Sequence, residues 1–149
     1  MKREIRFLVV HCTATTPDVK LQDIRRYWKQ ELGWKKPGYH YIILRNGEIV
    51  SLQKEHLLAN GVKDFNARSI HIAYIGGIDS NNQPEDNRSE EQQYAMYNLL
   101  QELTEKYPFA KLMGHRDFPN VARACPSFDV DTWWKEYKKI HDMAFAKRA

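Results

Sequence analysis

Apolar runs typical of strands alternate with stretches typical of helices along this chain of 149 residues, and this order most constrains its fold. Residues 5–11 form a β-branched, apolar run, which predicts a buried strand. Four more runs predict further strands: residues 39–44, 49–52, 69–75 and 110–113. The dipeptide Asn46-Gly47 joins the second and third strands and predicts a hairpin with positive φ at both turn residues.

Three helices are expected between and after these strands. Residues 19–32 predict the first, because apolar residues recur there at steps of three and four: Leu21, Ile24, Trp28 and Leu32. Ser89 and Gln92 form a capping box before the second helix. Its buried stripe is expected to be Met96, Leu99, Leu100 and Leu103. Asp131 is expected to cap a last helix that contains Trp133, Tyr137 and Ile140.

This alternation of strands and helices predicts the α/β class. Each apolar stripe must be buried against a neighbour, so we expect a mixed central β-sheet of about five strands with helices packed on its faces. The length suits a single domain over residues 1–149. Loops that carry chemistry should gather at one end of such a sheet.

The composition is that of a soluble globular protein, with 42% hydrophobic and 28% charged residues. No apolar run approaches the roughly 18 residues that a membrane helix needs. No signal peptide is expected, because residues 1–5 lead directly into the first strand. The net charge of +4 suits an anionic polymer such as bacterial wall or nucleic acid, or simply a solvated basic face. Without a basic run or a known nucleic-acid motif, neither nucleic acid nor membrane is expected as a partner.

A loop over residues 114–129 contains candidate metal ligands. Its glycine and prolines exclude a regular helix or strand, and it holds His115 and Cys125. Zinc binds histidine nitrogen and cysteine sulfur, and His11, at the end of the first strand, is the candidate third ligand. Cys12 points to the opposite face of that strand, so it is expected to be a small buried residue. A disulfide between Cys12 and Cys125 stays open as the alternative.

Several short motifs are spread over nearly the whole chain. Their identity and their order along the chain together indicate a family resemblance. They are Val9–Thr15, Gly33-Trp34, Gly38–Ile43, Arg45–Gly47, Asn66 with Ser69-Ile70, Gly76–Asp79, Gly114-His115, Ala124–Asp129 and Trp133-Trp134. In this ordered set the chain resembles the type 2 N-acetylmuramoyl-L-alanine amidases, which include small phage amidases and the peptidoglycan recognition proteins. The phage-type branch matches best.

The resemblance implies one Zn²⁺ per chain, held by His11, His115 and Cys125, and a catalytic Tyr39. It implies hydrolysis of the amide bond between N-acetylmuramic acid and L-alanine in bacterial peptidoglycan. Three protein ligands leave a position for water, whose pKa zinc lowers to about 7. The oxyanion that then forms needs donors, and the zinc, the Tyr39 hydroxyl and a cation can serve.

Two positions depart from the family pattern. Arg123 stands where the phage branch often has lysine, and it stays protonated. It is expected to stabilise an oxyanion or hold a substrate carboxylate, with pairing to a surface carboxylate as the alternative. Asn60 stands near a position where many relatives have histidine. The candidate substrate contacts are Trp34, Asn60 and Asn66, although Trp34 suits the core equally well.

The remaining histidines are expected to be structural: His40, His56, His71 and His141. A peptidoglycan amidase is the main functional expectation. The alternatives are a non-catalytic recognition module and, third, a basic nucleic-acid binder with a structural zinc. A monomer that waits in the cytoplasm until it is released would suit a phage or prophage lysis enzyme. A role in wall recycling and the preferred stem peptide stay open.

Overall fold

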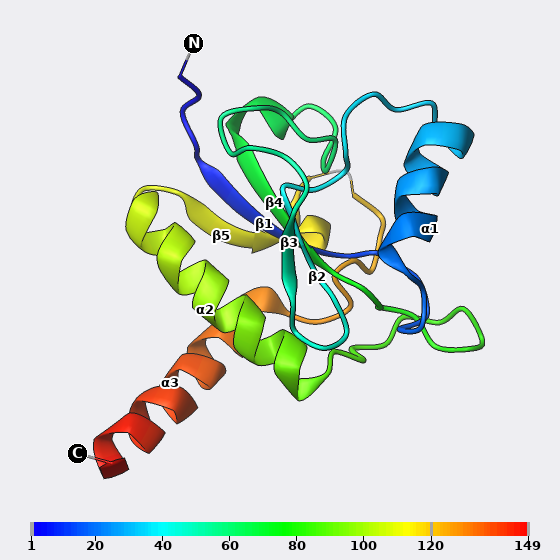
Figure 1. Ribbon diagram of the computed structural model, residues 1–149. Helices are drawn as coiled ribbons and strands as arrows, with labels where there is room; N and C mark the ends of the chain where they lie inside the picture. The colour runs from blue at the N-terminus through cyan, green and yellow to red at the C-terminus, as the bar shows by residue number, and fades with distance from the viewer. Residues whose placement is uncertain (1, 120, 149) are drawn as a thin grey trace.

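The computed structural model of the chain describes residues 2–119 and 121–148. Its centre is a five-stranded mixed sheet with helices on both faces, in the strand order β3-β2-β4-β1-β5 (Figure 1). The strands are β1 Phe7–Cys12, β2 Tyr41–Ile43, β3 Ile49–Ser51, β4 Ser69–Tyr74 and β5 Lys111–Gly114. Four of them run parallel, and β3 is antiparallel to β2. The expected α/β fold with a mixed sheet of about five strands is confirmed.

Three long helical segments and two short turns surround the sheet. They are α1 Leu21–Arg26 continued by η1 Tyr27–Glu31, η2 Asn66–Arg68, α2 Glu90–Lys106, η3 His115–Asp117 and α3 Val130–Arg148. Over the described ranges, no helix combines the length and the apolar character needed to cross a bilayer.

The central strand β1 divides its side chains between the two faces of the sheet. Val10 is fully buried in the cluster that α2 and α3 help to form. Val9 belongs to a separate cluster on the opposite face, and His11, two residues further on, shares that face. In the parallel pairing with β4, Val9 lies beside His71, which therefore points to the same side. The face opposite α2 and α3 thus receives two buried histidines.

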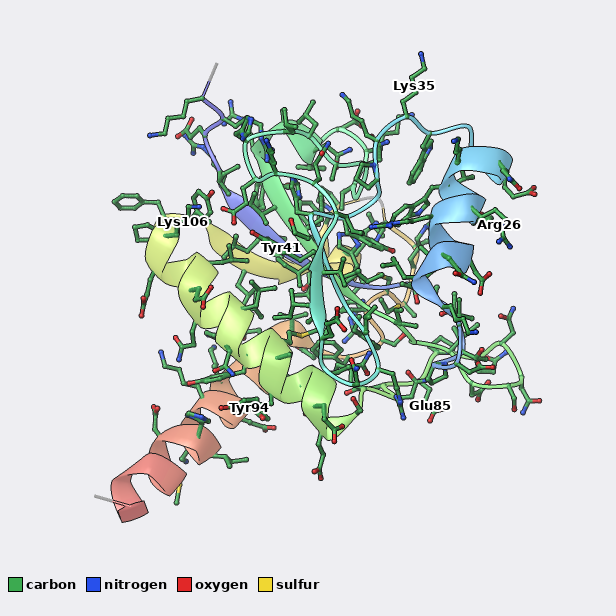
Figure 2. The ribbon with its side chains drawn as sticks, in the orientation of Figure 1. Arg26, Lys35, Tyr41, Glu85, Tyr94 and Lys106 are labelled. Atoms are coloured by element: carbon green, nitrogen blue, oxygen red, sulfur yellow. The ribbon has the colours of Figure 1, made fainter. Side chains whose placement is uncertain are left out.

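The first helix departs from the expected regular pattern. α1 continues into the π-helical turn η1, where the N–H of Leu32 bonds the carbonyl of Tyr27, five residues earlier, at 3.1 Å. Ile24 and Trp28 are buried as predicted, but the wider turn carries Leu32 to the surface, where it is 41% exposed. Arg26 points away from the sheet (Figure 2). The predicted stripe therefore holds as far as Trp28 and is wrong at Leu32.

The β2–β3 hairpin forms where it is expected, but its turn differs. The N–H of Gly47 donates to the carbonyl of Leu44 at 2.9 Å, and the N–H of Leu44 donates to the carbonyl of Glu48 at 2.8 Å. Gly47 has a φ of 90°, whereas Asn46 does not lie in the left-handed region. The expectation of positive φ at both residues is wrong, because this three-residue loop needs it only at the glycine.

The two long helices have well-defined beginnings. The predicted capping box of α2 is present, with Ser89 Oγ accepting from the N–H of Gln92 at 3.0 Å. Its predicted stripe is buried, at 0–7% exposed: Met96, Leu99, Leu100 and Leu103. The Asp129 carboxylate accepts a hydrogen bond from the first turn of α3 at 3.2 Å. Asp131 instead lies inside α3 and pairs with Lys135, so Asp129 replaces it as the cap.

Candidate metal centre

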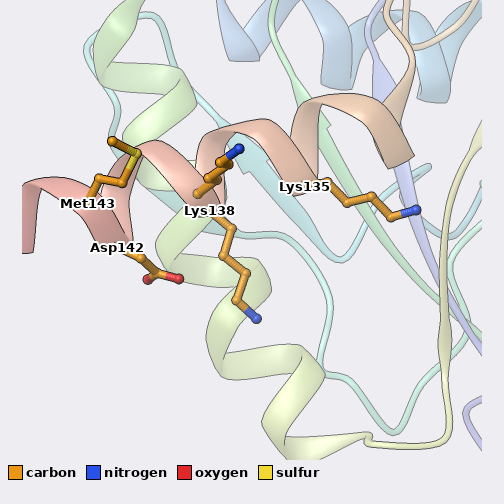
Figure 3. A pocket seen from close by; sticks show the side chains of 5 residues that line it. Lys135, Lys138, Asp142 and Met143 are labelled. Atoms are coloured by element: carbon orange, nitrogen blue, oxygen red, sulfur yellow. The ribbon is translucent and has the colours of Figure 1, made fainter.

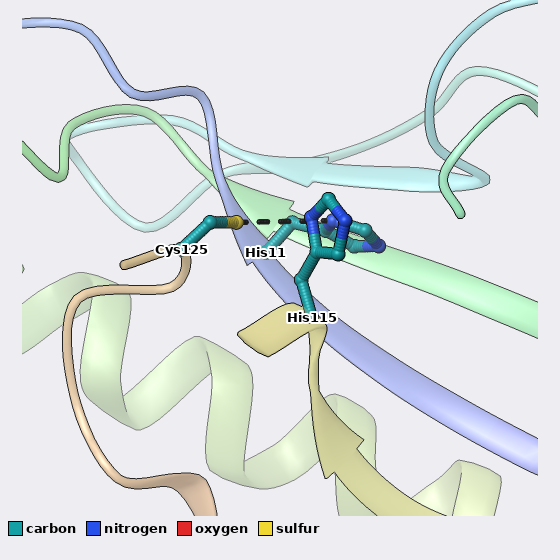
Figure 4. A group of neighbouring side chains, drawn as sticks. All are labelled: His11, His115 and Cys125. Carbon is teal, nitrogen blue, oxygen red and sulfur yellow. Dashed lines mark hydrogen bonds between the residues drawn. The ribbon is translucent and has the colours of Figure 1, made fainter. Parts of the chain in front are cut away.

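Parallel strands bring the predicted metal ligands to one edge of the sheet. His11 lies near the C-terminal end of β1, and β5 leads directly into η3, whose first residue is His115. Because β1 and β5 are parallel neighbours, their C-terminal ends meet at the same edge. Cys125, from the loop between η3 and α3, reaches the same place (Figure 4). A hydrogen bond of 2.9 Å from the N–H of Arg116 to the carbonyl of Cys125 ties this loop to η3.

The three side chains form a compact donor group. The ligand atoms of His11, His115 and Cys125 all lie within 4.8 Å of one another. Sγ of Cys125 is 3.9 Å from Nδ1 of His11, so Nδ1 is the nitrogen of His11 that faces the group. His11 is 1% exposed and Cys125 is 9% exposed. His115 is only half-buried, which leaves the group accessible from solvent.

Burial keeps both imidazoles neutral, which is the form that metals bind. Burial lowers the pKa of His11 well below its ordinary value, and the neighbouring His71 adds to this effect. The pKa of His115 is also lowered, first by burial and then by the positive charge of Arg123. A neutral imidazole keeps one nitrogen lone pair free. The group therefore offers two imidazole nitrogens and one sulfur to a metal.

The two cysteines lie close together, with Sγ of Cys125 3.2 Å from the backbone nitrogen of Cys12. Both thiols are free in the described part of the chain, so the disulfide that the sequence left open is not formed. The Cys12 side chain is 3% exposed and joins the apolar cluster beneath α2 and α3, as predicted for a small buried residue. The Cys12 thiol, followed by burial, raises the pKa of the Cys125 thiol well above its ordinary value. A metal cation reverses this effect, because a coordinating thiol loses its proton.

Tyr39 and Arg123, the predicted catalytic residues, lie at the same edge of the sheet. The Tyr39 ring is 5.1 Å from that of His11, between centroids, and its hydroxyl donates to the carbonyl of Cys12 at 3.2 Å. Burial raises the pKa of Tyr39 well above its ordinary value, and the charge of Arg123 opposes this shift. Tyr39 therefore keeps its proton and is a hydrogen-bond donor, while the exposed Arg123 adds positive charge.

Two of the predicted substrate contacts have partners within the protein. The half-buried Trp34 stacks on Trp28 with 6.5 Å between ring centroids. Asn60 joins two loops, because its backbone N–H donates to the carbonyl of Pro37 at 2.8 Å and its Nδ2 donates to that of Lys36 at 3.3 Å. These contacts explain how both residues are held in place. A substrate contact for either of them stays a prediction.

His71 is the site residue that sequence reasoning missed. Its expected role was purely structural, yet its Nδ1 lies 2.9 Å from Nε2 of His11. On its other side, Nε2 lies 2.8 Å from Oδ1 of Asn66, the third predicted substrate contact. The alternation of residues along the strand at 69–75 was the only hint of this role in the sequence. The register of β1 against β4 is what places His71 and His11 on one face of the sheet. Asn66 reaches the donor group through His71, and its substrate contact stays a prediction.

Two large hollows of the described surface lie away from the donor group. One, of about 480 Å³, lies on α3 and is lined by Lys135, Lys138, Lys139, Asp142 and Met143 (Figure 3). Another, of about 390 Å³, includes Tyr41, Glu55 and Tyr107 and lies at the N-terminal edge of the parallel strands. Neither is lined by a residue of the donor group, so cavity size does not identify the candidate site in this molecule.

Comparison with known proteins identifies the family. The family model described as N-acetylmuramoyl-L-alanine amidase matches residues 1–128. The chain is 39% identical over 141 residues to an endolysin of Klebsiella phage KP32, which covers 93% of this chain and 91% of that protein. Two solved structures are similar at 25% identity. The Ph2119 endolysin of Thermus scotoductus MAT2119 bacteriophage Ph2119 has a TM-score of 0.77, covering 91% of this chain and 86% of that chain. The N-acetylmuramoyl-L-alanine amidase LysC of Clostridium intestinale URNW has a TM-score of 0.76, covering 92% and 87%. This chain belongs to the type 2 N-acetylmuramoyl-L-alanine amidase family.

Proposed function

We propose that this protein hydrolyses the amide bond between N-acetylmuramic acid and L-alanine in bacterial peptidoglycan, and that it does so with one bound zinc ion. The observation that carries the proposal is the meeting of His11, His115 and Cys125 at the C-terminal edge of the sheet. The matching family model and the endolysin and amidase names of similar proteins support the reaction.

The donor group suits zinc in both chemistry and dimensions. Zinc–nitrogen and zinc–sulfur bonds of about 2.0 and 2.3 Å place tetrahedral ligand atoms about 3.6 Å apart. The 3.9 Å between His11 Nδ1 and Cys125 Sγ is close to that spacing. Three protein ligands are typical of catalytic zinc sites, in which a fourth position stays open. Zinc bound there supplies Lewis acidity, which acidifies water and polarises a carbonyl.

Tyr39 and Arg123 are the proposed catalytic side chains. As the substrate carbonyl becomes tetrahedral, negative charge develops on its oxygen, and a fixed donor stabilises that charge. The Tyr39 hydroxyl can supply such a donor by exchanging its bond to the Cys12 carbonyl for one to the substrate. Arg123 adds a permanent positive charge but cannot release a proton. Hydrolysis moves one proton from the attacking water to the leaving amine. We assign the relay to Tyr39, which would give its proton to the amine and regain one from that water, so that it ends the reaction protonated as it began.

A lysis role fits the similar proteins best. Several of them are named endolysins of phages. We propose that this protein is the lysis amidase of a phage or prophage, that it acts as a monomer, and that it stays in the cytoplasm until released to the wall. Its macromolecular partner is then peptidoglycan itself.

Defined muropeptides test the reaction. The purified, zinc-loaded protein should release L-alanine peptides with new free amino groups, detected by mass spectrometry, and should contain about one zinc per chain. His11→Ala should abolish turnover, and Arg116→Ala, in η3 but outside the donor group, is the control. New reducing sugar ends would contradict the amidase reaction. Tight binding of wall fragments without turnover would identify a recognition module instead.

A further inference from the structure

A buried line of hydrogen-bonded side chains runs away from the back of the donor group. Nε2 of His11 lies 2.9 Å from Nδ1 of His71, and Nε2 of His71 lies 2.8 Å from Oδ1 of Asn66. Both imidazole rings are essentially inaccessible, at 1% and 0% exposed. The line ends at Asn66 Oδ1, which also accepts the backbone N–H groups of Gly61 at 3.1 Å and Val62 at 2.8 Å.

The end of this line determines where its protons lie. A backbone N–H can only donate, so the Asn66 atom that receives two of them is the oxygen. This oxygen carries no proton, so Nε2 of His71 must donate to it. In a neutral ring, Nδ1 of His71 is then a bare acceptor, and Nε2 of His11 must donate to it. Nδ1 of His11 keeps its lone pair, and this is the atom that faces Cys125.

The buried surroundings of His71 keep its ring neutral. Within the described chain, the side-chain partners of its ring are His11 and Asn66, and neither is an anion. A charged imidazole at 0% exposure would lack compensation for its lost hydration.

Two hydrogen bonds of its backbone and a close glycine fix the position of His71. The N–H of His71 donates to Nδ1 of His40 at 3.0 Å, and the N–H of His40 donates to the carbonyl of His71 at 2.9 Å. Gly61 leaves room for the ring, since a Cβ at that position would lie 2.3 Å from Nδ1 of His71. Gly61 does not have a positive φ, so the ring contact is what calls for glycine there.

We propose that His71, backed by Asn66, is a positioning residue of the metal centre. It holds His11 as the Nε2–H tautomer and directs the free Nδ1 toward the metal. The inference rests on the proposed zinc site. Hydrogen bonds to the second nitrogen of a ligating histidine set its tautomer and orientation, and their loss typically costs about 10–100-fold in metal affinity. Here the partner is another neutral histidine, itself oriented by a carboxamide.

The proton positions can be measured in the metal-free protein without any substitution. Nitrogen–proton correlation NMR of the imidazole rings distinguishes the Nε2–H from the Nδ1–H tautomer. We expect the Nε2–H form for both His11 and His71. An Nδ1–H form of His11 overturns the inference, whether or not the protein binds zinc.

Zinc affinity tests the positioning itself. His71→Ala should weaken zinc binding about 10–100-fold, measured by competition with a chromophoric chelator. His56→Ala removes an exposed histidine and should leave the affinity unchanged. Gly61→Ala should also weaken binding, because its methyl group displaces the His71 ring while every hydrogen-bonding side chain remains. A variant that combines Gly61→Ala with His71→Ala should lose no more zinc affinity than His71→Ala alone.

The outcomes separate this inference from the metal site on which it rests. If His71→Ala and Gly61→Ala both bind zinc within about twofold of the wild type, His71 has no positioning role. If the wild-type protein binds no zinc, the proposed metal site fails. The tautomer of His11 in the metal-free protein then still shows whether His71 orients the ring.

Discussion

The backbone N–H of Cys12 donates a hydrogen bond to Sγ of Cys125 at 3.2 Å, across 113 residues of chain. This contact joins the end of the central strand to the loop that carries the proposed cysteine ligand. A negatively charged sulfur accepts such a bond more strongly than a neutral thiol does. The strand backbone therefore stabilises the thiolate that a metal requires, while the Cys12 side chain packs in the apolar cluster beneath α2 and α3.

The two cysteines should respond differently to substitution. Cys125→Ser should lower zinc affinity by at least about 100-fold and abolish amidase activity, because a hydroxyl is a far poorer zinc ligand than a thiolate. Cys12→Ala should retain zinc and cost about 1 kcal/mol of unfolding free energy, since it removes one small buried group. Zinc content by atomic spectroscopy and urea denaturation measure the two effects. Loss of zinc from Cys12→Ala alone would reverse the assignment.

Tyr39→Phe should slow turnover without removing the metal. The hydroxyl is the only part that changes, and losing one donor to a developing oxyanion typically costs about 100-fold or more in kcat. Zinc content should stay equal to that of the wild type, because Tyr39 contacts the Cys12 carbonyl rather than occupying a place in the donor group. Tyr27→Phe, at an exposed tyrosine, is the matched control. Undiminished kcat would exclude Tyr39 from the chemistry.

Arg123 should act through its charge. Arg123→Ala is expected to lower kcat by about 10–100-fold, whereas Arg123→Lys should stay within about tenfold of the wild type, because it keeps the cation. Arg116→Ala, which removes an exposed arginine of η3, is the control for a general change in surface charge. Steady-state rates on a defined muropeptide provide the measurement. Equal rates for Arg123→Ala and the wild type would favour a surface role for Arg123.

The buried Arg88 should matter for stability rather than for catalysis. Its guanidinium lies 3.5 Å from the Phe128 ring centroid and 4.5 Å from that of Trp133, and it pairs with Asp86 at 2.8 Å. Arg88→Ala should cost roughly 2–4 kcal/mol, because it removes these contacts and leaves a cavity. Arg26→Ala breaks only an exposed pair and should cost less than about 0.5 kcal/mol. Chemical denaturation with zinc present compares the two variants.

Unfolding free energy of the metal-free protein should fall in mild acid, and His40 should contribute. Burial lowers its pKa from 6.5, so just below pH 6.5 the unfolded chain binds a proton that the folded chain does not. The contribution of neutral His40 to the unfolding free energy is complete above pH 6.5. It is lost as the pH falls below that value, at up to about 1.4 kcal/mol per pH unit. His40→Gln should flatten the slope, while His56→Gln, at an exposed site, should not. An unchanged slope in His40→Gln would contradict this origin.

Local patterns in the sequence were sufficient to predict the elements of the fold. Strand runs depend on β-branched and apolar neighbours, and the α2 cap depends on Ser89 and Gln92, three residues apart. The errors arose at helix ends and in the hairpin turn. The π-turn before Leu32 and the single positive φ in the β2–β3 loop each satisfy the same sequence with a different hydrogen-bond spacing.

The ordered family motifs likewise pointed to His11, His115 and Cys125, and the structure brings these three together. What the sequence could not supply was register. His71 lies 60 residues from His11, and nothing local says that β1 and β4 pair in parallel with Val9 beside His71.

By itself, then, the sequence indicated the strands, the helices and the family, because each depends on residue type and on the order of short motifs. It also pointed to the candidate donor residues. Only the tertiary structure decided that His71 and Asn66 stand behind His11, and that Cys125 receives the Cys12 N–H. Those contacts depend on which strands pair and in what register, and that choice is made by burial of the whole sheet between its helices.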